Sequence, residues 1–503
     1  MHYITKYSIF LMMLLTFISC EKYESKEISK QGNTDNTSIL KETQIINPYS
    51  VTNMSIAYAN IKSSFPEDSL NIKPTHYYIK FMPIDDEQFS LLKIDSTLNI
   101  YDFPLDYVQI EGSGAYHDPA VPEGQPTYQY ASVKVDYSFP NVPYQILENL
   151  YIPEEDQILY QSHENLIDSL VYESLRLTNN LGDEMRGDHW QPKGNIKLRD
   201  EDLDENESIP LEGVKVRARR LMTTYTGITN RDGHFECDGT FKYKANYSIK
   251  WERYDFEIRD SWLGTATYNG PYKKGDWNLD DTIGVQKFYG TIFKAAHHYY
   301  YKDIKGLRRP PQNTFWKTQL TIRAYNEANA DNGQHCAPCR FLGLGSAIKI
   351  YNPQHPSSEI YGTVMHEIAH ASHWNMDQHG YNYGCDINAE SYARGVQWVL
   401  TNMVYDYNLF DKYSRYRYTG VAQDMIDGSK TTTSIYYYFS KDNEWVVLYR
   451  SYYDQVNGYT IRQIEDALIG QEGWPQWKNN IKYLYNNGTE NNLDATFDYW
   501  ILQ

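Results

Sequence analysis

The period of the hydrophobic residues changes along this 503-residue chain, and that change constrains the fold more than any other feature. The segment 210–218 alternates apolar and charged residues, as a half-buried strand does. The segment 357–375 instead repeats apolar residues every three or four positions, at Ile360, Val364, Ile368 and Ala371. A chain of this length is also too long for one hydrophobic core. Together these patterns predict a multidomain α+β protein.

Composition and turn residues divide the chain into successive parts. Residues 1–20 have the pattern of an export signal, and residues 21–45 form a polar, flexible linker. We expect a mixed α+β module at 46–190, a β-rich segment at 193–262 and a part at 263–503 whose pattern is first helical and then mixed.

Short apolar runs predict the elements of these parts. Strands are expected at Tyr77–Phe81 and Tyr128–Tyr137. Helices are expected at Ile146–Leu150, Leu166–Leu177 and Glu444–Tyr453.

The N-terminal segment predicts export and a lipid anchor. Lys6 precedes a short apolar stretch, Ile9 to Ile18, which is too short to span a bilayer. Ser19-Cys20 directly after such a stretch resembles the lipobox of bacterial lipoproteins, although Phe17 stands where that pattern usually has Leu. The resemblance implies acylation of Cys20 and localisation in the cell envelope, in the outer membrane, with the lipid as the sole contact with the membrane.

Net charge bears on the partners. The chain has 47 basic and 65 acidic residues, for a formal net charge of −18. An acidic surface repels phosphate backbones, so we expect no nucleic acid partner.

Four cysteines remain if Cys20 carries lipid: Cys237, Cys336, Cys339 and Cys385. In an exported protein, disulfides are the default expectation, and the sequence does not fix the pairing. The spacing Cys336-Ala-Pro-Cys339 also suits a redox pair or half a zinc site, but we expect a structural disulfide.

The β-rich segment carries a recognisable pattern. Pro210-Leu-Glu-Gly-Val214 precedes Thr226-Gly-Ile-Thr-Asn-Arg-Asp-Gly-His-Phe235, in which Asp232-Gly233 forms a turn. This arrangement resembles the carboxypeptidase regulatory-like, transthyretin-like β-sandwich. The resemblance implies a small sandwich at 193–262 that acts as a spacer or support, with no chemistry of its own.

The chemistry of the chain is concentrated on one predicted helix, 357–375, for which Ser357 is the expected N-cap. His366 and His370 lie four residues apart, about 40° apart around a helix, so both imidazoles reach one metal ion. Glu367 lies beside them, where it can take a proton from water that zinc has polarised. This is the H-E-x-x-H arrangement of zinc hydrolases.

Glu390 is the expected third ligand. It follows His370 by twenty residues, at the start of a second predicted helix. This spacing resembles the thermolysin-like gluzincins, whereas His373 and Met376 stand where metzincins have glycine and histidine. The resemblance implies a zincin-like catalytic domain at 263–503, with an active-site helix, a mostly helical lower subdomain and Zn²⁺ bound by His366, His370 and Glu390.

Several neighbours leave alternatives open. His379 and Asp386 are rival third ligands. Arg394 stands where gluzincins have a second-shell aspartate, so Asp386 is a candidate for orienting the histidines and Arg394 for a buried salt bridge or an oxyanion contact. His373 is expected to cap or bridge near the helix end.

Two further parts of a protease site are less defined. No histidine follows residue 379, so a tyrosine is needed as oxyanion donor, with Tyr436, Tyr437 and Tyr438 among the candidates. The strand-like segment Ala347–Tyr351 is a candidate edge strand for substrate.

The sequence therefore supports two hypotheses. The first is an envelope-tethered zinc metallopeptidase in which Glu367 activates water to hydrolyse protein or peptide substrates. The second is a non-catalytic binding or scaffold lipoprotein of a surface nutrient-capture system, with a structural or inactive metal site.

Overall fold

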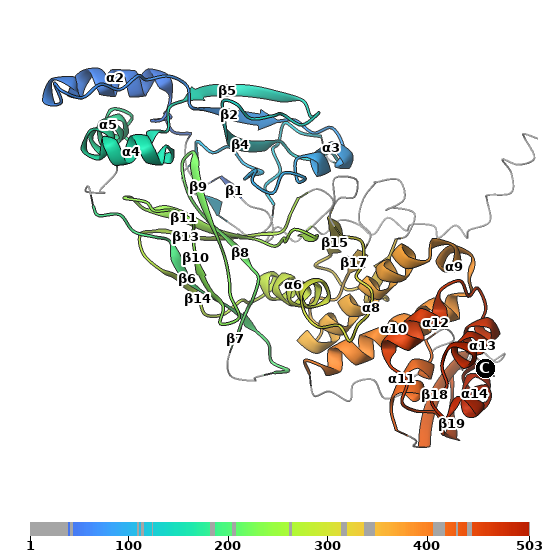
Figure 1. The fold of residues 1–503 in the computed structure, drawn as a ribbon. Helices are drawn as coiled ribbons and strands as arrows, with labels where there is room; N and C mark the ends of the chain where they lie inside the picture. The colour runs from blue at the N-terminus through green and yellow to red at the C-terminus, as the bar shows by residue number, and fades with distance from the viewer. Residues whose placement is uncertain are drawn as a thin grey trace, which may run out of the picture. The chain divides into compact units, whose positions relative to one another are not determined.

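The structure is a computed structural model. It describes residues 39–40, 44–107, 110–111, 115–122, 124–181, 187–203, 208–260, 264–312, 319–336, 348–405, 418–428, 431–439 and 445–501. The predicted signal segment, Cys20 and most of the linker lie outside these ranges. The described chain is a mixed α+β protein with several separate sheets, as the change of hydrophobic period predicts (Figure 1).

The first part is built on an antiparallel sheet in the order β4-β2-β5, with helices packed beside it. Buried residues of α2 and α5, including Met54, Leu166 and Leu170, share one hydrophobic cluster with Leu150 of β5. The elements of this part are β1 (Ile39–Leu40), α2 (Val51–Ile61), the 3₁₀ helix η2 (Lys62–Ser64), β2 (His76–Phe81), α3 (Asp86–Leu91), β3 (Ile110–Glu111), β4 (Gln129–Lys134), β5 (Tyr144–Leu150), the 3₁₀ helix η3 (Pro153–Glu155), α4 (Gln157–Ser162) and α5 (Glu164–Leu177).

Three of the four expected elements here are confirmed, and one is wrong. The expected strands correspond to β2 and β4, and the expected helix at Leu166–Leu177 is α5. The segment Ile146–Leu150 is not helical, because it lies in β5 and pairs with β2. Five apolar and polar residues in a row carry no period long enough to separate helix from strand.

Two four-stranded sheets follow. One has the order β13-β11-β8-β9, and the other joins β10, β6, β14 and β7. Their buried side chains, such as Ile196, Val216 and Tyr247, belong to one core cluster. The strands are β6 (Lys193–Arg199), β7 (Ser208–Pro210), β8 (Lys215–Arg220), β9 (Thr223–Ile228), β10 (His234–Glu236), β11 (Ala245–Lys250), β13 (Thr267–Lys273) and β14 (Trp277–Leu279).

The next sheet has the order β12-β15-β17-β16. It consists of β12 (Phe256–Arg259), β15 (Leu320–Ala324), β17 (Ile348–Ile350) and β16 (Gly333–His335). Its first three strands are parallel, and only β16 runs antiparallel. The strand β12 falls within the range of the predicted sandwich but pairs in parallel with β15, and both strands are buried along their whole length.

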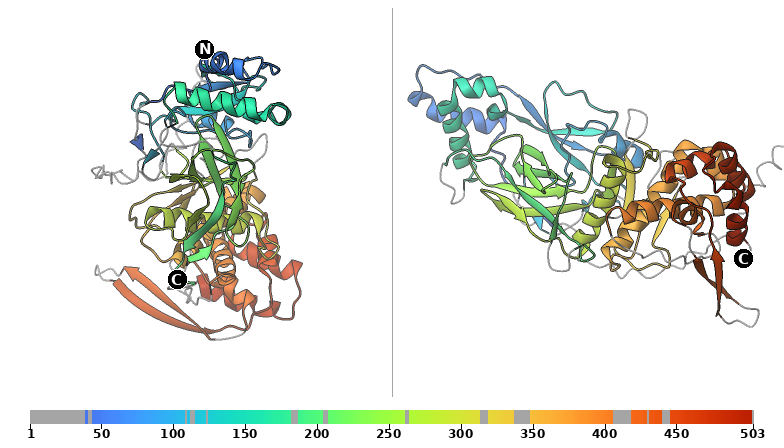
Figure 2. Two further views of the ribbon diagram at one scale, coloured as in Figure 1. Left: turned by 90° about the vertical axis from the view of Figure 1, so that its left-hand side faces the viewer. Right: turned by 60° about the horizontal axis from the view of Figure 1, so that its bottom comes forward.

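Next to this sheet, α8 (Ser357–Met376) packs against two other helices, α6 (Val285–Tyr301) and α10 (Asp386–Asn402). Helix α8 contacts α6 and α10 (Figures 1 and 2). It also contacts the strands β16 and β17. The N-cap residue of α8 is Pro356, not Ser357 as predicted. Asp202 accepts a hydrogen bond from the Ser358 N–H at 2.7 Å, so a distant carboxylate satisfies the end of the helix.

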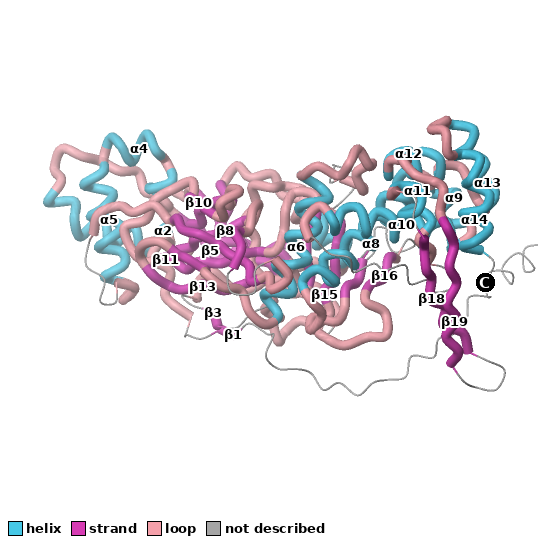
Figure 3. The backbone as a smooth tube through the Cα atoms, turned by 90° about the horizontal axis from the view of Figure 1, so that it is seen from below, coloured by secondary structure: helices cyan, strands magenta, loops and turns pink. Residues whose placement is uncertain are grey.

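The C-terminal part is mainly helical and includes one hairpin (Figure 3). Its elements are α9 (Gln378–Tyr383), α11 (Val421–Ile426), β18 (Thr431–Phe439), β19 (Trp445–Tyr453), α12 (Ile461–Leu468), α13 (Trp474–Leu484), the 3₁₀ helix η4 (Glu490–Asn492) and α14 (Leu493–Ile501). The predicted helix at Glu444–Tyr453 is wrong, since Trp445–Tyr453 pairs along its whole length with β18. None of the described helices is long and apolar enough to cross a bilayer.

Candidate metal centre

Two helices bring His366, His370 and Glu390 together, as the sequence predicts. The Nε2 atoms of His366 and His370 are 3.1 Å apart. Oε2 of Glu390, on α10, lies 3.1 Å from Nε2 of His366 and 3.2 Å from Nε2 of His370. His366 and His370 are 7% and 4% exposed, so this triangle of atoms is largely removed from water.

The arrangement of these three atoms is explained better by a shared metal ion than by hydrogen bonds among them. If the Nε2 atoms of His366 and His370 both carry a proton, two hydrogen-bond donors face each other. If one of them lacks its proton, that nitrogen is an acceptor and faces the Glu390 carboxylate, which is also an acceptor. Protons alone therefore cannot satisfy all three contacts. A tetrahedral zinc ion at about 2.0–2.1 Å from each ligand would set the ligand atoms roughly 3.3 Å apart, close to the spacing here. The residues present fit a divalent metal of the zinc type.

The charge state of Glu390 suits a ligand. Burial alone would raise the pKa of Glu390, but hydrogen bonds and attraction from His366 and His370 outweigh burial and hold the pKa well below its usual range. The carboxylate is therefore ionised, as a metal ligand must be.

Glu367 is held beside the triangle, with its side chain against β16. It is 6% exposed. A Cβ atom built at Gly333 would lie 2.6 Å from Oε1 of Glu367, so the glycine leaves the space that this carboxylate fills. Burial, with smaller contributions from Glu390 and Asp331, raises the pKa of Glu367 to about 8 in the absence of a metal, although His370 acts in the opposite direction.

The rival ligands lie elsewhere. His379 is exposed and its Nε2 lies 2.9 Å from Oε1 of Glu472. Asp386 begins α10 and does not belong to the group of converging ligand atoms. Nor does Asp386 orient the histidines, because Nδ1 of His366 and Nδ1 of His370 have no hydrogen-bond partner within the described chain.

The structure also bears on the expectations for Arg394 and His373. Arg394 makes no ion pair among the described residues, and its Nη1 donates instead to the carbonyl of Tyr418 at 2.9 Å. His373 neither caps nor bridges: it is buried against the rings of Tyr381 and Tyr392, and neither ring nitrogen has a hydrogen-bond partner in the described chain. In both cases sequence spacing gave the position on the helix but not the neighbour from another element.

The structure adds two residues that the sequence did not reveal. His335 of β16 places its ring 6.2 Å from that of His370, nearly parallel to it. The hydroxyl of Tyr381, on α9, lies 2.8 Å from Nδ1 of His335, and the Tyr381 ring also contacts His370. One tyrosine among 48 and an isolated histidine carry no sequence signal, since the contact arises only when β16 and α9 meet over α8.

The strand and cysteine predictions are resolved in part. The strand β17 lies between β15 and β16, so it is not the edge strand expected at Ala347–Tyr351, and β16 is the terminal strand of this sheet in the described chain. Cys336 is disulfide-bonded, as expected, while Cys237 and Cys385 are free. Cys339 lies outside the described residues, as do the side chains of Tyr436, Tyr437 and Tyr438 in β18.

Comparison with known proteins gives no relative. No protein family, no curated protein and no solved structure matches this chain.

Proposed function

We propose that this chain is a zinc-dependent peptidase. The observation that carries the proposal is the convergence of two imidazole nitrogens of α8 and one carboxylate oxygen of α10 within 3.1–3.2 Å of one another. Helix α8 also presents a buried acid, Glu367. A purely structural zinc site is usually closed by a fourth protein ligand, whereas three protein ligands leave one position open. The converging group here has three members among the described residues.

Glu367 is the proposed general base. When bound, zinc supplies Lewis acidity, which polarises a carbonyl and makes water more acidic. Glu367 then accepts the proton of the attacking water and delivers it to the leaving amine. Close packing against Gly333 keeps the Glu367 carboxylate in one orientation beside the ligand atoms.

The strand β16 is the proposed support for substrate. It is antiparallel to β17 and terminal in its sheet, and its residue Gly333 lies directly against Glu367. An extended peptide added to this edge would be hydrogen-bonded through its main chain and would pass the base. The substrate class we propose is therefore an unfolded protein or peptide.

Tyr381 is the proposed oxyanion donor. Its hydroxyl is positioned by Nδ1 of His335, and its ring lies against His370. Burial raises the pKa of Tyr381, so the hydroxyl keeps its proton and can donate it to a developing negative charge.

The test compares wild type with Glu367→Gln. Wild-type protein should bind zinc and cleave a casein-like substrate, and a chelator should stop cleavage. Glu367→Gln, which conserves shape, should retain zinc by elemental analysis and lose hydrolysis. Undiminished turnover in this variant would remove the proposed base.

The second candidate, a binding lipoprotein, is supported by a cavity elsewhere in the chain. Its volume is about 610 Å³, within the range of ligand pockets. Its lining includes Tyr49, Tyr160, Tyr225, Asp168 and Arg220. A zinc-loaded wild type that cleaves no peptide would favour this candidate.

For either candidate we propose attachment to the outer membrane through lipid on Cys20. Metabolic labelling with a radioactive fatty acid should mark the wild type and not Cys20→Ser. Equal labelling would contradict the anchor.

A further inference from the structure

A second cavity, of about 240 Å³, is lined by none of the residues of the candidate metal centre. Its walls come from the segment after α3, from β8, β9 and β11, and from residues 252–254. The charged residues of its lining are Lys93, Asp95, Lys215, Lys250, Glu252 and Arg253. Four cations thus meet two carboxylates, a local positive excess in a chain whose formal net charge is −18.

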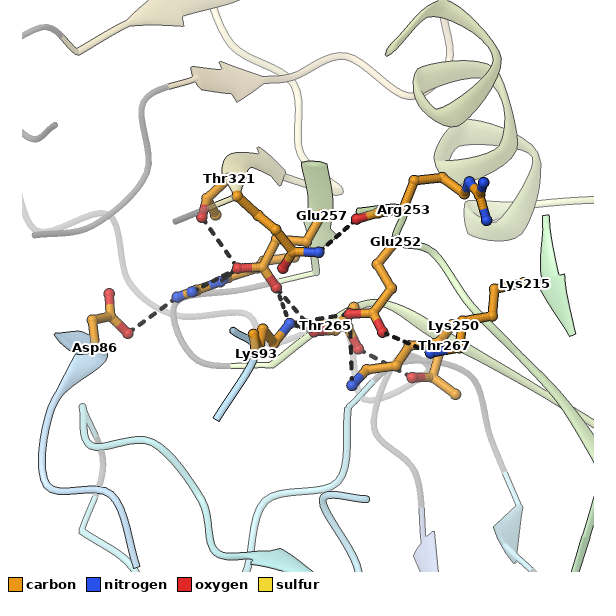
Figure 4. A network of polar contacts seen from close by, with 12 residues as sticks. Asp86, Lys93, Lys215, Lys250, Glu252, Arg253, Glu257, Thr265, Thr267 and Thr321 are labelled. Atoms are coloured by element: carbon orange, nitrogen blue, oxygen red, sulfur yellow. Dashed lines mark hydrogen bonds and ion pairs between the residues drawn. The ribbon is translucent and has the colours of Figure 1, made fainter. Parts of the chain in front are cut away.

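A single carboxylate, that of Glu252, forms ion pairs with three ammonium groups of this cavity (Figure 4). Glu252 lies 3.3 Å from Nζ of Lys93, 3.7 Å from Nζ of Lys250 and 4.0 Å from Nζ of Lys215. The other carboxylate, Asp95, accepts hydrogen bonds from the backbone and hydroxyl of Thr97.

Neighbouring carboxylates do not offset the positive excess, because each of them also faces a further cation. Asp102 attracts Lys250, but it attracts Arg217 as well.

Two other carboxylates lie beside Lys93 and the arginines. Glu257 binds Lys93 but is also bound by Arg259 at 2.7 Å. Asp86 is shared by Arg259 and Arg323. These two acids and two arginines balance one another, so the excess stays with the lysines of the cavity.

The ammonium groups of Lys215 and Lys250 have unused hydrogen-bond donors. Within the described chain, neither Lys215 nor Lys250 donates a side-chain hydrogen bond, because each lies beyond 3.5 Å from Glu252. Lys250 is 7% exposed. Burial, together with repulsion from Lys93, Arg217 and Lys215, lowers the pKa of Lys250 to about 7 despite the opposing attraction of Glu252. An ammonium group in such a place is stabilised by an added anion.

We propose that this cavity binds a small oxyanion of the phosphate or sulfate class, held by the ammonium groups of Lys215 and Lys250. The cavity is smaller than the roughly 300–1,000 Å³ typical of sites for drug-sized ligands, which favours a small ion. Oxyanions of this class offer several acceptor oxygens to ammonium donors that the protein itself leaves unmatched.

The test is calorimetric titration of the full chain with sodium phosphate and, separately, with sodium sulfate at constant ionic strength. Wild type should give saturable heat with at least one of the two ions, and the comparison identifies which ion binds. Lys250→Met and Lys215→Met should each weaken binding about tenfold or more. Lys482→Met, which removes a lysine paired with Asp494 on the surface of α13, should bind as wild type does.

Circular dichroism checks that each variant is folded. If Lys250→Met does not fold, Lys215→Met carries the test, because Lys215 is partly exposed. The absence of saturable heat with both ions in wild type would overturn the proposal. Unchanged affinity in the folded lysine variants would also overturn it.

Discussion

Gly333 of β16 and Glu367 of α8 occupy complementary spaces: a Cβ atom at Gly333 would lie 2.6 Å from Oε1 and 2.8 Å from Cγ of Glu367. Gly333 is not among the glycines with positive φ, so its backbone would accept alanine. The glycine is therefore required for space and not for conformation. This close approach ties the position of the proposed base to the proposed substrate strand.

Gly333→Ala should reduce peptide hydrolysis without removing the metal. The added methyl displaces the Glu367 carboxylate, and a misplaced base lowers kcat by about tenfold or more. Gly428→Ala is a matched control, because nothing lies within 4 Å of its added Cβ. Equal kcat values for the Gly333→Ala and Gly428→Ala variants would show that the position of Glu367 is not limiting.

Glu390→Ala should weaken zinc affinity by more than about 100-fold, since even residues that only support a ligand cost 10–100-fold. Asp386→Ala and His379→Ala should retain zinc, because neither side chain joins the converging group. Zinc affinity is measured by competition with a chelator of known affinity. Zinc loss in Asp386→Ala, with retention in Glu390→Ala, would reverse the assignment of the third ligand.

Tyr381→Phe should lower kcat by about 10²–10³-fold, the usual effect of deleting an oxyanion donor, and leave zinc content unchanged. Tyr383→Phe, on the same short helix but exposed, is the control and should keep wild-type kcat. If Tyr381→Phe hydrolyses peptides at the wild-type rate, the donor is another group.

Glu154 should make stability depend on pH. Burial, with repulsion from Glu155 and Asp168, raises the pKa of Glu154 to about 7 against an ordinary value of 4.5, although the Tyr49 hydrogen bond opposes this shift. The folded chain keeps this proton between pH 4.5 and 7 and the unfolded chain does not, so the stabilisation present below pH 4.5 is lost as pH rises through 7.

Glu154→Gln removes this loss. The free energy of unfolding of the variant, relative to wild type, should increase by about 1–3 kcal/mol between pH 4.5 and pH 8. Urea denaturation at the two pH values measures the difference. A constant difference across this range would contradict burial of the Glu154 carboxyl.

The sequence predicts the position of a site residue best where that position depends on the geometry of a single helix. His366 and His370 share a face of α8 by helical spacing alone, and that spacing does not depend on any other element. Glu390 could be predicted as a third ligand because α10 follows α8 closely in the sequence and packs against it. The positions of the three candidate ligands were therefore predictable before any contact was known.

Contacts between distant segments were not predictable. Gly333, His335 and Tyr381 reach α8 from β16 and α9, and no local period marks them. His373 lies on its helix as predicted but does not cap or bridge, because its neighbours Tyr381 and Tyr392 are set by packing. Packing likewise sets the contact of Arg394 with the Tyr418 carbonyl. The segment Trp445–Tyr453 failed differently: its apolar run fits a helix or a strand, and pairing with β18 decides it.

Elemental analysis of the purified chain tests the central claim most directly, with His366→Ala measured beside wild type. The account predicts about one zinc per wild-type chain, as in a site with three protein ligands, and almost none in the variant. Wild-type protein that stays free of zinc when supplied with it would contradict the account, and so would a His366→Ala variant that retains a full equivalent.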